Sequence, residues 1–262
     1  PDGSDLSLVA GGLTPQQEAQ LERFGQRIDN SPVSSLVLNT GRSWIATEFL
    51  CSAIRSDKLH YALVEHGCEL WDVRSGQQVD LEYCAAQSPD PAVFAGVLAS
   101  RQHIRHLIEW FVDDGARQLC DELKFDGQLR AQLDKSWNLT FGVPHELEGD
   151  HVYATLQQLV ARQPDLAGEF VFHYSRWNRY LDVMGTMDKG AGLALTMSLL
   201  EQPLDYSAAI GDGLNDIAML EKAALPVCPA NAEAAVRELC SQRGFVSQQH
   251  FVDATLDWLN TL

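Results

Sequence analysis

The residues best suited to chemistry lie in one acidic loop, Gly-Asp-Gly-Leu-Asn-Asp at residues 211–216. The loop follows the apolar run at residues 206–210, which predicts a strand, and it precedes an amphipathic segment that predicts a helix. Carboxylates placed where a strand of an α/β sheet ends lie at the edge that binds ligands. The oxygens of Asp212, Asn215 and Asp216 therefore suit a hard cation such as Mg²⁺. The alternative is that these side chains only cap the helix.

Two further segments place suitable groups for phosphate at a strand end and at a helix start. Thr40-Gly41-Arg42 closes a predicted strand at residues 35–39, and its hydroxyl, its N–H groups and the next helix N-terminus suit an anion. Lys189 stands at the start of a predicted helix, where the helix dipole disfavours a cation. Lys189 could neutralise a phosphate, or a carboxylate that attacks one. The alternatives are a helix cap for Thr40 and solvated surface charges for Arg42 and Lys189.

Strands and helices alternate with short loops near both ends of the chain, which predicts a parallel sheet. Helices are expected at residues 16–28, 45–54, 191–200, 217–223, 232–239 and 251–262, and strands at residues 35–39, 61–64, 206–210 and 225–228. The stretch between these two parts contains helices and strands of antiparallel type. We therefore expect an α/β fold with a Rossmann-like parallel sheet core at residues 1–81 and 186–262, carrying an inserted α+β cap domain at residues 82–185.

One turn of the expected cap domain is a candidate for contact with a substrate. It covers residues 175–179, between strands expected at residues 170–174 and 180–184. Arg176, Trp177 and Arg179 combine positive charge with a flat apolar surface suited to sugars. The alternative is an ordinary exposed hairpin.

The composition limits the classes of partner. The chain has 262 residues and a formal net charge of -17, with 19 Lys and Arg against 36 Asp and Glu, which argues against nucleic acid and anionic membranes as main partners. No apolar run reaches the roughly 20 residues that span a bilayer. Six cysteines without a CxxC pair are expected to be reduced thiols in a cytoplasmic protein. A small phosphorylated metabolite stays compatible, because local basic residues can outweigh the global charge.

The order of these segments resembles the haloacid dehalogenase-like phosphatases, in the branch with a large α+β cap that includes sucrose-phosphate phosphatases. The resemblance runs from about residue 36 to residue 231, and residues 211–216 are its most specific part. Residues 64–69 also look like the stretch that these proteins place before the cap. In that family an Asp-x-Asp-x-Thr strand supplies the Asp that attacks phosphorus and a second Asp that acts as general acid and base. The resemblance implies a Mg²⁺-dependent phosphatase acting on a small phosphorylated metabolite, expected to be a sugar phosphate.

The resemblance also implies roles for individual residues. It implies that Lys189 and Asp212 are catalytic, that Asp212 and Asp216 belong to the metal site with Asp212 as the ligand, and that Asn215 supports them. It implies that Thr40 binds the phosphoryl group. The full set of residues expected to contact phosphate or substrate is Thr40, Gly41, Arg42, Lys189, Asn215, Arg176 and Arg179.

The chain departs from the family pattern, because no Asp-x-Asp-x-Thr precedes Thr40. One interpretation, which we favour, is that the motif lies upstream of Pro1 and that the first residues form the loop after it. The other is that residues 6–9 are the first strand and that residues 10–14 have lost both carboxylates. The first interpretation predicts a phosphatase whose nucleophile is not in this chain. The second predicts a non-catalytic protein that binds a phosphorylated ligand.

Overall fold

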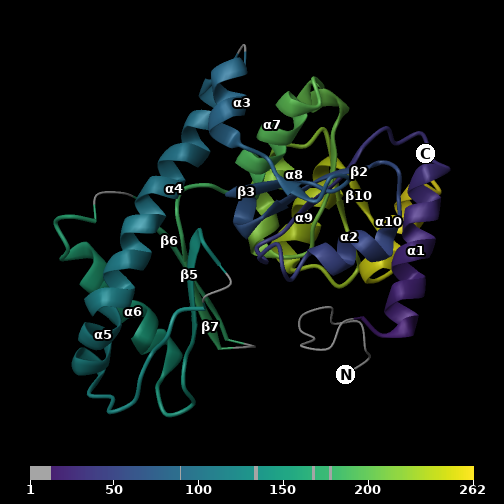
Figure 1. Ribbon diagram of the computed structural model, residues 1–262. Helices are drawn as coiled ribbons and strands as arrows, with labels where there is room; N and C mark the ends of the chain where they lie inside the picture. The colour runs from purple at the N-terminus through teal and green to yellow at the C-terminus, as the bar shows by residue number, and fades with distance from the viewer. Residues whose placement is uncertain (1–12, 89, 133–134, 167–168, 177–178) are drawn as a thin grey trace. The chain divides into compact units, whose positions relative to one another are not determined.

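The computed structural model describes residues 13–262 except residues 89, 133–134, 167–168 and 177–178. The fold is mixed α/β, as the sequence predicted, and the chain divides into two compact units (Figure 1). The first unit runs to Val93 and resumes at Asp188, and the second is Phe94–Met187. Segments at residues 1–12 that the sequence analysis discussed, and Trp177, lie outside the described residues.

The first unit contains one sheet in which parallel and antiparallel pairing are combined. Its strands are β1 (Leu36–Asn39), β2 (Leu59–Val64), β3 (Glu69–Asp72) and β4 (Gln77–Gln78). They lie in the order β1-β2-β3-β4, with β1 parallel to β2 and the next two pairs antiparallel. β1 and β2 follow the expected parallel pattern, and Asn39 of β1 lies opposite Leu63 of β2.

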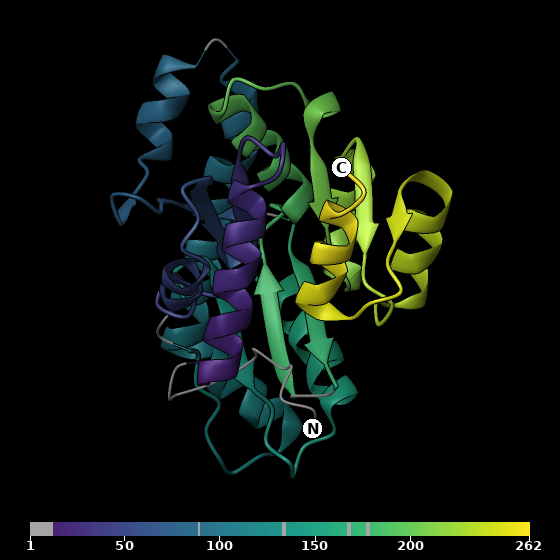
Figure 2. The same ribbon diagram turned by 90° about the vertical axis from the view of Figure 1, so that its right-hand side faces the viewer.

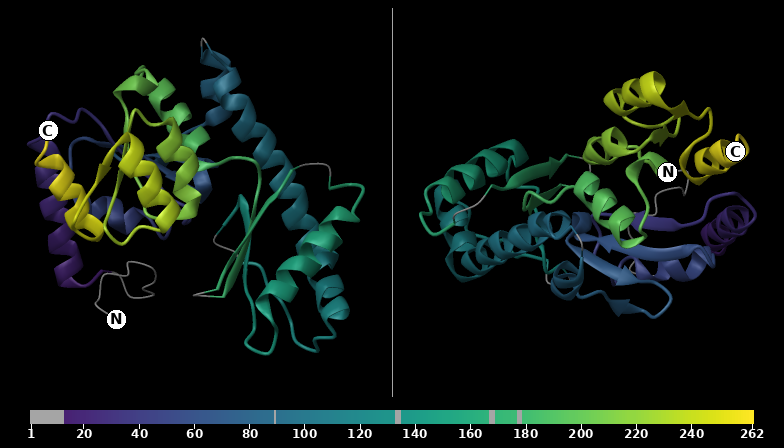
Figure 3. Two further views of the ribbon diagram at one scale, coloured as in Figure 1. Left: turned by 180° about the vertical axis from the view of Figure 1, so that it is seen from behind. Right: turned by 90° about the horizontal axis from the view of Figure 1, so that it is seen from above.

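A second sheet in the first unit is fully parallel. Its strands are β8 (Ala208–Ile210), β9 (Leu225–Cys228) and β10 (Phe245–Val246), drawn in green to yellow in Figure 3. The order is β10-β9-β8, so β8 pairs with β9 alone among the described residues, just as β1 pairs with β2 alone. Among the described residues, the expected single parallel sheet is therefore present as two sheets, and β1 and β8 each pair on one side only.

Seven helices described in the first unit surround these sheets: α1 (Pro15–Asp29), α2 (Glu48–Ile54), α3 (Leu81–Gln87), α7 (Lys189–Leu199), α8 (Ile217–Lys222), α9 (Ala234–Arg243) and α10 (Phe251–Leu259). α1 corresponds to the helix expected at residues 16–28. It begins with a capping box, because Thr14 Oγ1 accepts a hydrogen bond from the Gln17 N–H and the Gln17 side chain accepts one from the Thr14 N–H. α1 and α10 lie side by side, linked by an ion pair between Arg23 and Asp253 (Figure 2).

The two sheets of the first unit share apolar packing. Leu38 of β1 and Ile210 of β8 pack against one buried cluster that also contains Phe24 of α1 and Trp258 of α10. The preceding side chain of β8, Ala209, packs in a different cluster with residues of α8 and α9. The alternation of side chains along β8 therefore buries both of its faces under helices, which is typical of a strand in the middle of an α/β layer.

The second unit has an antiparallel sheet with helices packed against it. Its elements are α4 (Ala92–Trp110), which begins at the end of the first unit, α5 (Ala116–Leu123), β5 (Asn138–Gly142), α6 (Gly149–Ala161), β6 (Val171–Ser175) and β7 (Tyr180–Met184). The strand order is β5-β7-β6. The buried cluster includes Phe111, Phe141 and Val183, and the rings of Phe111 and Phe141 stack at 5.1 Å. None of the helices in the described part of the chain combines the length and the apolar composition needed to cross a bilayer.

The connection between α4 and α5 is continuous and contains a glycine. The chain continues through a π-helical turn, Phe111–Gly115. A Cβ at Gly115 would lie 2.8 Å from the Trp110 ring, so the absence of a side chain lets the wide turn close over that ring. Gly115 therefore permits a continuous helical path from α4 to α5.

Packing of α1 on α2 gives a prediction about stability. A Cβ at Gly25 would lie 1.7 Å from the carbonyl oxygen of Ile54, so Gly25→Ala forces the two helices apart. We expect it to lower the free energy of unfolding by about 2 kcal/mol or more, measured by urea denaturation. The matched control is Gly96→Ala in α4, where an added Cβ meets nothing within 4 Å. The control should raise stability by about 0.5–1 kcal/mol through helix propensity, and a loss of equal size in both variants would contradict the packing argument.

Candidate functional site

The predicted site residues of the first unit lie where strands end and helices begin. Thr40 follows the last residue of β1, residues 211–216 follow β8, and Lys189 is the first residue of α7. The carboxyl ends of β1 and β8 therefore carry the chemically competent loops, as expected for an α/β sheet.

A buried ion pair joins α7 to the acidic loop. Lys189 Nζ donates to Asp216 Oδ1 at 2.5 Å, and the two side chains are 10% and 6% exposed. The second carboxylate oxygen, Asp216 Oδ2, accepts hydrogen bonds from the N–H groups of Asp212 at 2.9 Å and Gly213 at 3.1 Å. A Cβ at Gly211 would lie 2.4 Å from Asp216 Cβ, so this close approach requires glycine. Asp216 thus fixes the shape of the loop, and Lys189 compensates its charge.

Asn39 ties the end of β1 to the start of α7. Its Nδ2 donates to the carbonyl oxygen of Lys189 at 2.9 Å, while Asp188 Oδ1 caps α7 by accepting from the Ala191 N–H at 2.7 Å. The sequence analysis missed Asn39, although a polar residue that ends an apolar strand was a usable signal. Through this contact, the segment that begins at Thr40 and the Lys189 backbone are held in one place.

Asp212 presents its carboxylate at the surface of the loop. Its carbonyl oxygen accepts from the Glu233 N–H at 2.9 Å, which holds the loop against the start of α9. Partial desolvation and then the negative charge of Asp216 raise the pKa of Asp212, and the Lys189 ammonium acts in the opposite direction. The charged form of Asp212 therefore gains from a nearby cation.

The oxygen atoms of the acidic loop are of the type that a hard cation prefers, but too few of them are available as metal ligands. The Asp212 carboxylate is a suitable oxygen ligand, whereas both Asp216 oxygens already accept hydrogen bonds. In the described part of the chain, no three His, Cys, Asp or Glu side chains gather closely enough to hold a metal ion. A complete Mg²⁺ site would therefore need ligands beyond those that the described side chains bring together.

The Thr40-Gly41-Arg42 segment forms a tight turn that is hydrogen-bonded to β2. Thr40 Oγ1 accepts from the Arg42 N–H at 3.2 Å, and the Thr40 N–H donates to the Leu63 carbonyl at 2.9 Å. These two hydrogen bonds fix the position of the Thr40 hydroxyl and of the turn's backbone. Asn215 lies exposed in the acidic loop, and its Oδ1 would be 2.9 Å from a Cβ at Gly213.

Arg176 and Arg179 belong to the second unit, where both have local partners. Arg176 pairs with both carboxylate oxygens of Asp150, at 3.1 and 2.9 Å, and is exposed. Arg179 donates to the carbonyl oxygens of three residues, Val143, Pro144 and Leu147. Both arginines line a cavity of about 530 Å³ at this end of the unit. Arg176 is therefore held by one exposed ion pair, whereas the Arg179 guanidinium is occupied by three backbone carbonyl oxygens.

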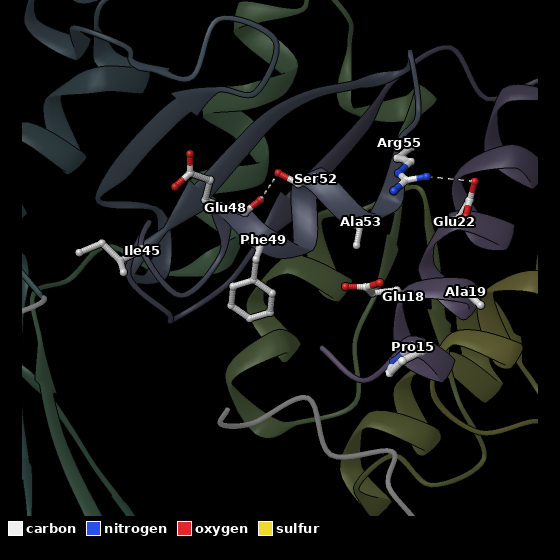
Figure 4. Close-up of a pocket in the computed structure, with 10 residues that line it drawn as sticks. All are labelled: Pro15, Glu18, Ala19, Glu22, Ile45, Glu48, Phe49, Ser52, Ala53 and Arg55. Atoms are coloured by element: carbon white, nitrogen blue, oxygen red, sulfur yellow. Dashed lines mark hydrogen bonds and ion pairs between the residues drawn. The ribbon is translucent and has the colours of Figure 1, made fainter. Parts of the chain in front are cut away.

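A second cavity, of about 540 Å³, lies between α1 and α2 (Figure 4). Its lining includes three carboxylates, Glu18, Glu22 and Glu48, and Arg55 pairs with Glu22. It contains none of the residues that the sequence predicted for phosphate or metal. We therefore place the candidate site at the strand ends and not in this cavity.

Comparisons with known proteins support the family resemblance. A family model described as haloacid dehalogenase-like hydrolase matches residues 134–250. The structure is similar to sucrose-phosphatase from Synechocystis in complex with sucrose and phosphate, with 17% identity, a TM-score of 0.62, and coverage of 93% of this chain and 91% of that chain. No curated protein matches the chain in sequence.

Two structures from Bacteroides thetaiotaomicron show the same fold. One is a haloacid dehalogenase-like hydrolase with 15% identity, a TM-score of 0.59, and coverage of 98% of this chain and 95% of that chain. The other is a phosphatase of the haloalkanoate enzyme superfamily with 17% identity, a TM-score of 0.55, and coverage of 97% and 90%. The match over residues 134–250 agrees with the resemblance to the haloacid dehalogenase-like hydrolases that the motifs predicted, and phosphatases are among the structural neighbours.

The buried ion pair yields a prediction that a double substitution can test. Lys189→Met leaves the buried Asp216 charge without its cation, and we expect a loss of about 3–5 kcal/mol of unfolding free energy. Adding Asp216→Asn should restore part of that loss, because the amide oxygen still accepts from the loop N–H groups and carries no charge. Lys222→Met, at an exposed position of α8, is the control and should change stability little. Strictly additive losses in the double variant would contradict the coupling.

The two arginines of the second unit are expected to behave differently. Arg179→Met removes hydrogen bonds to three carbonyl oxygens and should lower unfolding free energy by about 1–3 kcal/mol. Arg176→Met breaks an exposed ion pair and should change it by less than about 1 kcal/mol. Denaturation curves of both variants would compare them, and equal losses would show that the Arg179 contacts have been overvalued.

Proposed function

We propose that the protein acts as a Mg²⁺-dependent phosphatase on a small phosphorylated metabolite, with a sugar phosphate as the expected substrate class. The observation that carries the proposal is the buried Lys189–Asp216 pair, which fixes the Asp212 loop at the end of β8. Asn39 connects the same helix start to the Thr40 turn at the end of β1. Three segments thus supply the Lys189 ammonium, the exposed Asp212 carboxylate and the Thr40 hydroxyl.

This arrangement suits phosphoryl transfer because that chemistry depends on positioning and charge neutralisation. Thr40 and the N–H groups of its turn would bind the phosphoryl oxygens, with Gly41 allowing close approach and Arg42 adding positive charge. Lys189 would offset the charge that develops there, while Asn215 borders the site. Bound Mg²⁺ would neutralise phosphoryl charge and polarise a phosphoryl oxygen. Asp212, supported by Asp216, would hold it.

The open edges of β1 and β8 support a nucleophile on a further strand. Both strands are parallel to their one described neighbour, and both pack on the same apolar cluster. Unpaired ladder groups at two such edges are costly unless a strand fills the space. We infer that a parallel strand between them carries the aspartate that forms the aspartyl phosphate. Under the first interpretation of the sequence, residues before Pro1 supply this strand and its aspartate. Under the second, residues 6–9 are the first strand and residues 10–14 contain no carboxylate, so the aspartate is absent.

Two observations support a sugar phosphate and a specificity role for the second unit. The similar sucrose-phosphatase was determined with sucrose and phosphate. In the second unit, the exposed Arg176 lines a cavity, where its guanidinium would donate hydrogen bonds to a bound sugar phosphate. We propose that this unit is the cap domain. Arg176 would contact the substrate, and Arg179 would hold the backbone that lines the same cavity.

One feature of the sequence favours a second candidate function, a non-catalytic protein that binds a phosphorylated ligand. No Asp-x-Asp-x-Thr precedes Thr40, so the chain as given offers no matching nucleophile. The phosphate and cation groups described above would serve a binding protein equally well. The two functions differ in turnover and not in affinity.

The test compares the chain as given with the chain extended by any residues that its gene encodes before Pro1. The extended chain should hydrolyse an aryl phosphate in the presence of Mg²⁺, and the chain as given should not. Asp212→Asn in the extended chain should lower turnover about 100-fold or more, because it removes the cation ligand. Asp205→Asn, an exposed acidic change just before the other end of β8, is the matched control and should leave turnover unchanged. An inactive extended chain that still binds phosphate would favour the non-catalytic alternative.

A further inference from the structure

The connection between β2 and β3 holds three successive residues in the left-handed region of backbone conformation. The φ angles are 50° at Glu65, 59° at His66 and 92° at Gly67. Gly67 adopts this conformation without penalty, but the two residues before it have side chains that disfavour it. Glu65 is also buried, with 1% of its surface exposed. Such strain persists where the surrounding structure fixes it, and it is concentrated at functional sites.

The strained connection is bonded directly to the Thr40 turn. The Glu65 N–H donates to the Arg42 carbonyl at 2.8 Å, and the His66 N–H donates to the Thr40 carbonyl at 3.0 Å. These two bonds bring the imidazole against Gly41, where an added Cβ would lie 2.4 Å from His66 Nε2 and 2.5 Å from Cε1. Gly41 therefore leaves room for the imidazole beside the segment proposed to bind the phosphoryl group.

The hairpin alone does not account for histidine at this position. Glycine would meet the demand for positive φ without strain, although histidine tolerates it better than most residues with a side chain. Among the other described non-glycine residues with positive φ, Arg55 and Lys124 are C-caps of α2 and α5, Glu201 lies just after α7, and Arg179 lies between β6 and β7. His66 does not end a helix of this kind, and its ring is half-buried against the candidate site.

We propose that His66 is a further phosphate-binding residue, whose imidazole donates a hydrogen bond to the oxyanion held by the Thr40 turn. The ligand class is the phosphoryl group of a phosphate monoester, or free phosphate. The inference rests on the proposed function, because that function places the oxyanion at Thr40. The strain at Glu65 and His66 is then the cost of aiming the ring at the ligand.

The test measures binding of inorganic phosphate, with Mg²⁺ present, to the full chain by calorimetry, together with unfolding curves. His66→Asn keeps a residue that tolerates positive φ and removes the imidazole, so it should retain stability and weaken phosphate binding about tenfold. His66→Gly should raise stability by relieving strain and weaken phosphate binding by the same factor. A purely structural histidine would leave phosphate affinity unchanged in both variants.

Arg55→Gly is the matched control, because it relieves the same kind of strain at φ 50° outside the proposed site. It should raise stability and leave phosphate affinity unchanged. Unchanged affinity in both His66 variants, with wild-type binding intact, would overturn the role of His66 alone. Absence of phosphate binding by the wild-type chain would overturn the proposed function and the role of His66 with it.

Discussion

The candidate site depends on one buried interaction, the ion pair between Lys189 and Asp216. A buried carboxylate is costly unless its oxygens are paired, and Asp216 is paired by an ammonium and two backbone N–H groups. This satisfies its charge and at the same time determines the path of the loop that carries Asp212. Lys189 stands at a helix start, where the dipole opposes it, so the pairing with Asp216 explains a placement that local electrostatics disfavours.

The requirement that buried polar groups be paired applies also to the backbone of the two sheets. Helices cover both faces of the strand layer in the first unit, yet β1 and β8 each have one described neighbour. Side chains from both strands enter a common apolar cluster, so the two sheets behave as parts of one layer and not as separate domains. Among the described residues, two things are therefore lacking at this place: a neighbour for the backbone N–H and C=O groups at the open edges of β1 and β8, and further ligands for a metal ion. One additional strand with carboxylates at its end would supply both.

Local rules predicted the elements well and the contacts between distant elements less well. The helix expected at residues 16–28 is α1, and the unfavourable position of Lys189 at a helix start indicated an anionic partner, which in the structure is Asp216. Asn39 and His66 were missed because their importance lies in contacts with Lys189 and Gly41, which no periodicity reveals. Arg179 looked free for a ligand in the sequence, but its guanidinium reaches three carbonyl oxygens brought near by the antiparallel fold.

The features that favour ligand binding are also those that weaken the unliganded fold. Desolvation and the neighbouring Asp216 disfavour the charged form of Asp212, and the strained Glu65–His66 connection disfavours the β2–β3 hairpin. On the proposed function, each cost is offset when a suitable ligand is present: a cation stabilises the Asp212 carboxylate, and an oxyanion accepts a hydrogen bond from the His66 imidazole. Binding and folding are therefore coupled at this edge of the sheet, since any ligand that prefers the folded chain adds to its stability. Asp212 and His66, which are unfavourable in the unliganded fold, are thus among the residues proposed to bind the cation and the phosphoryl group.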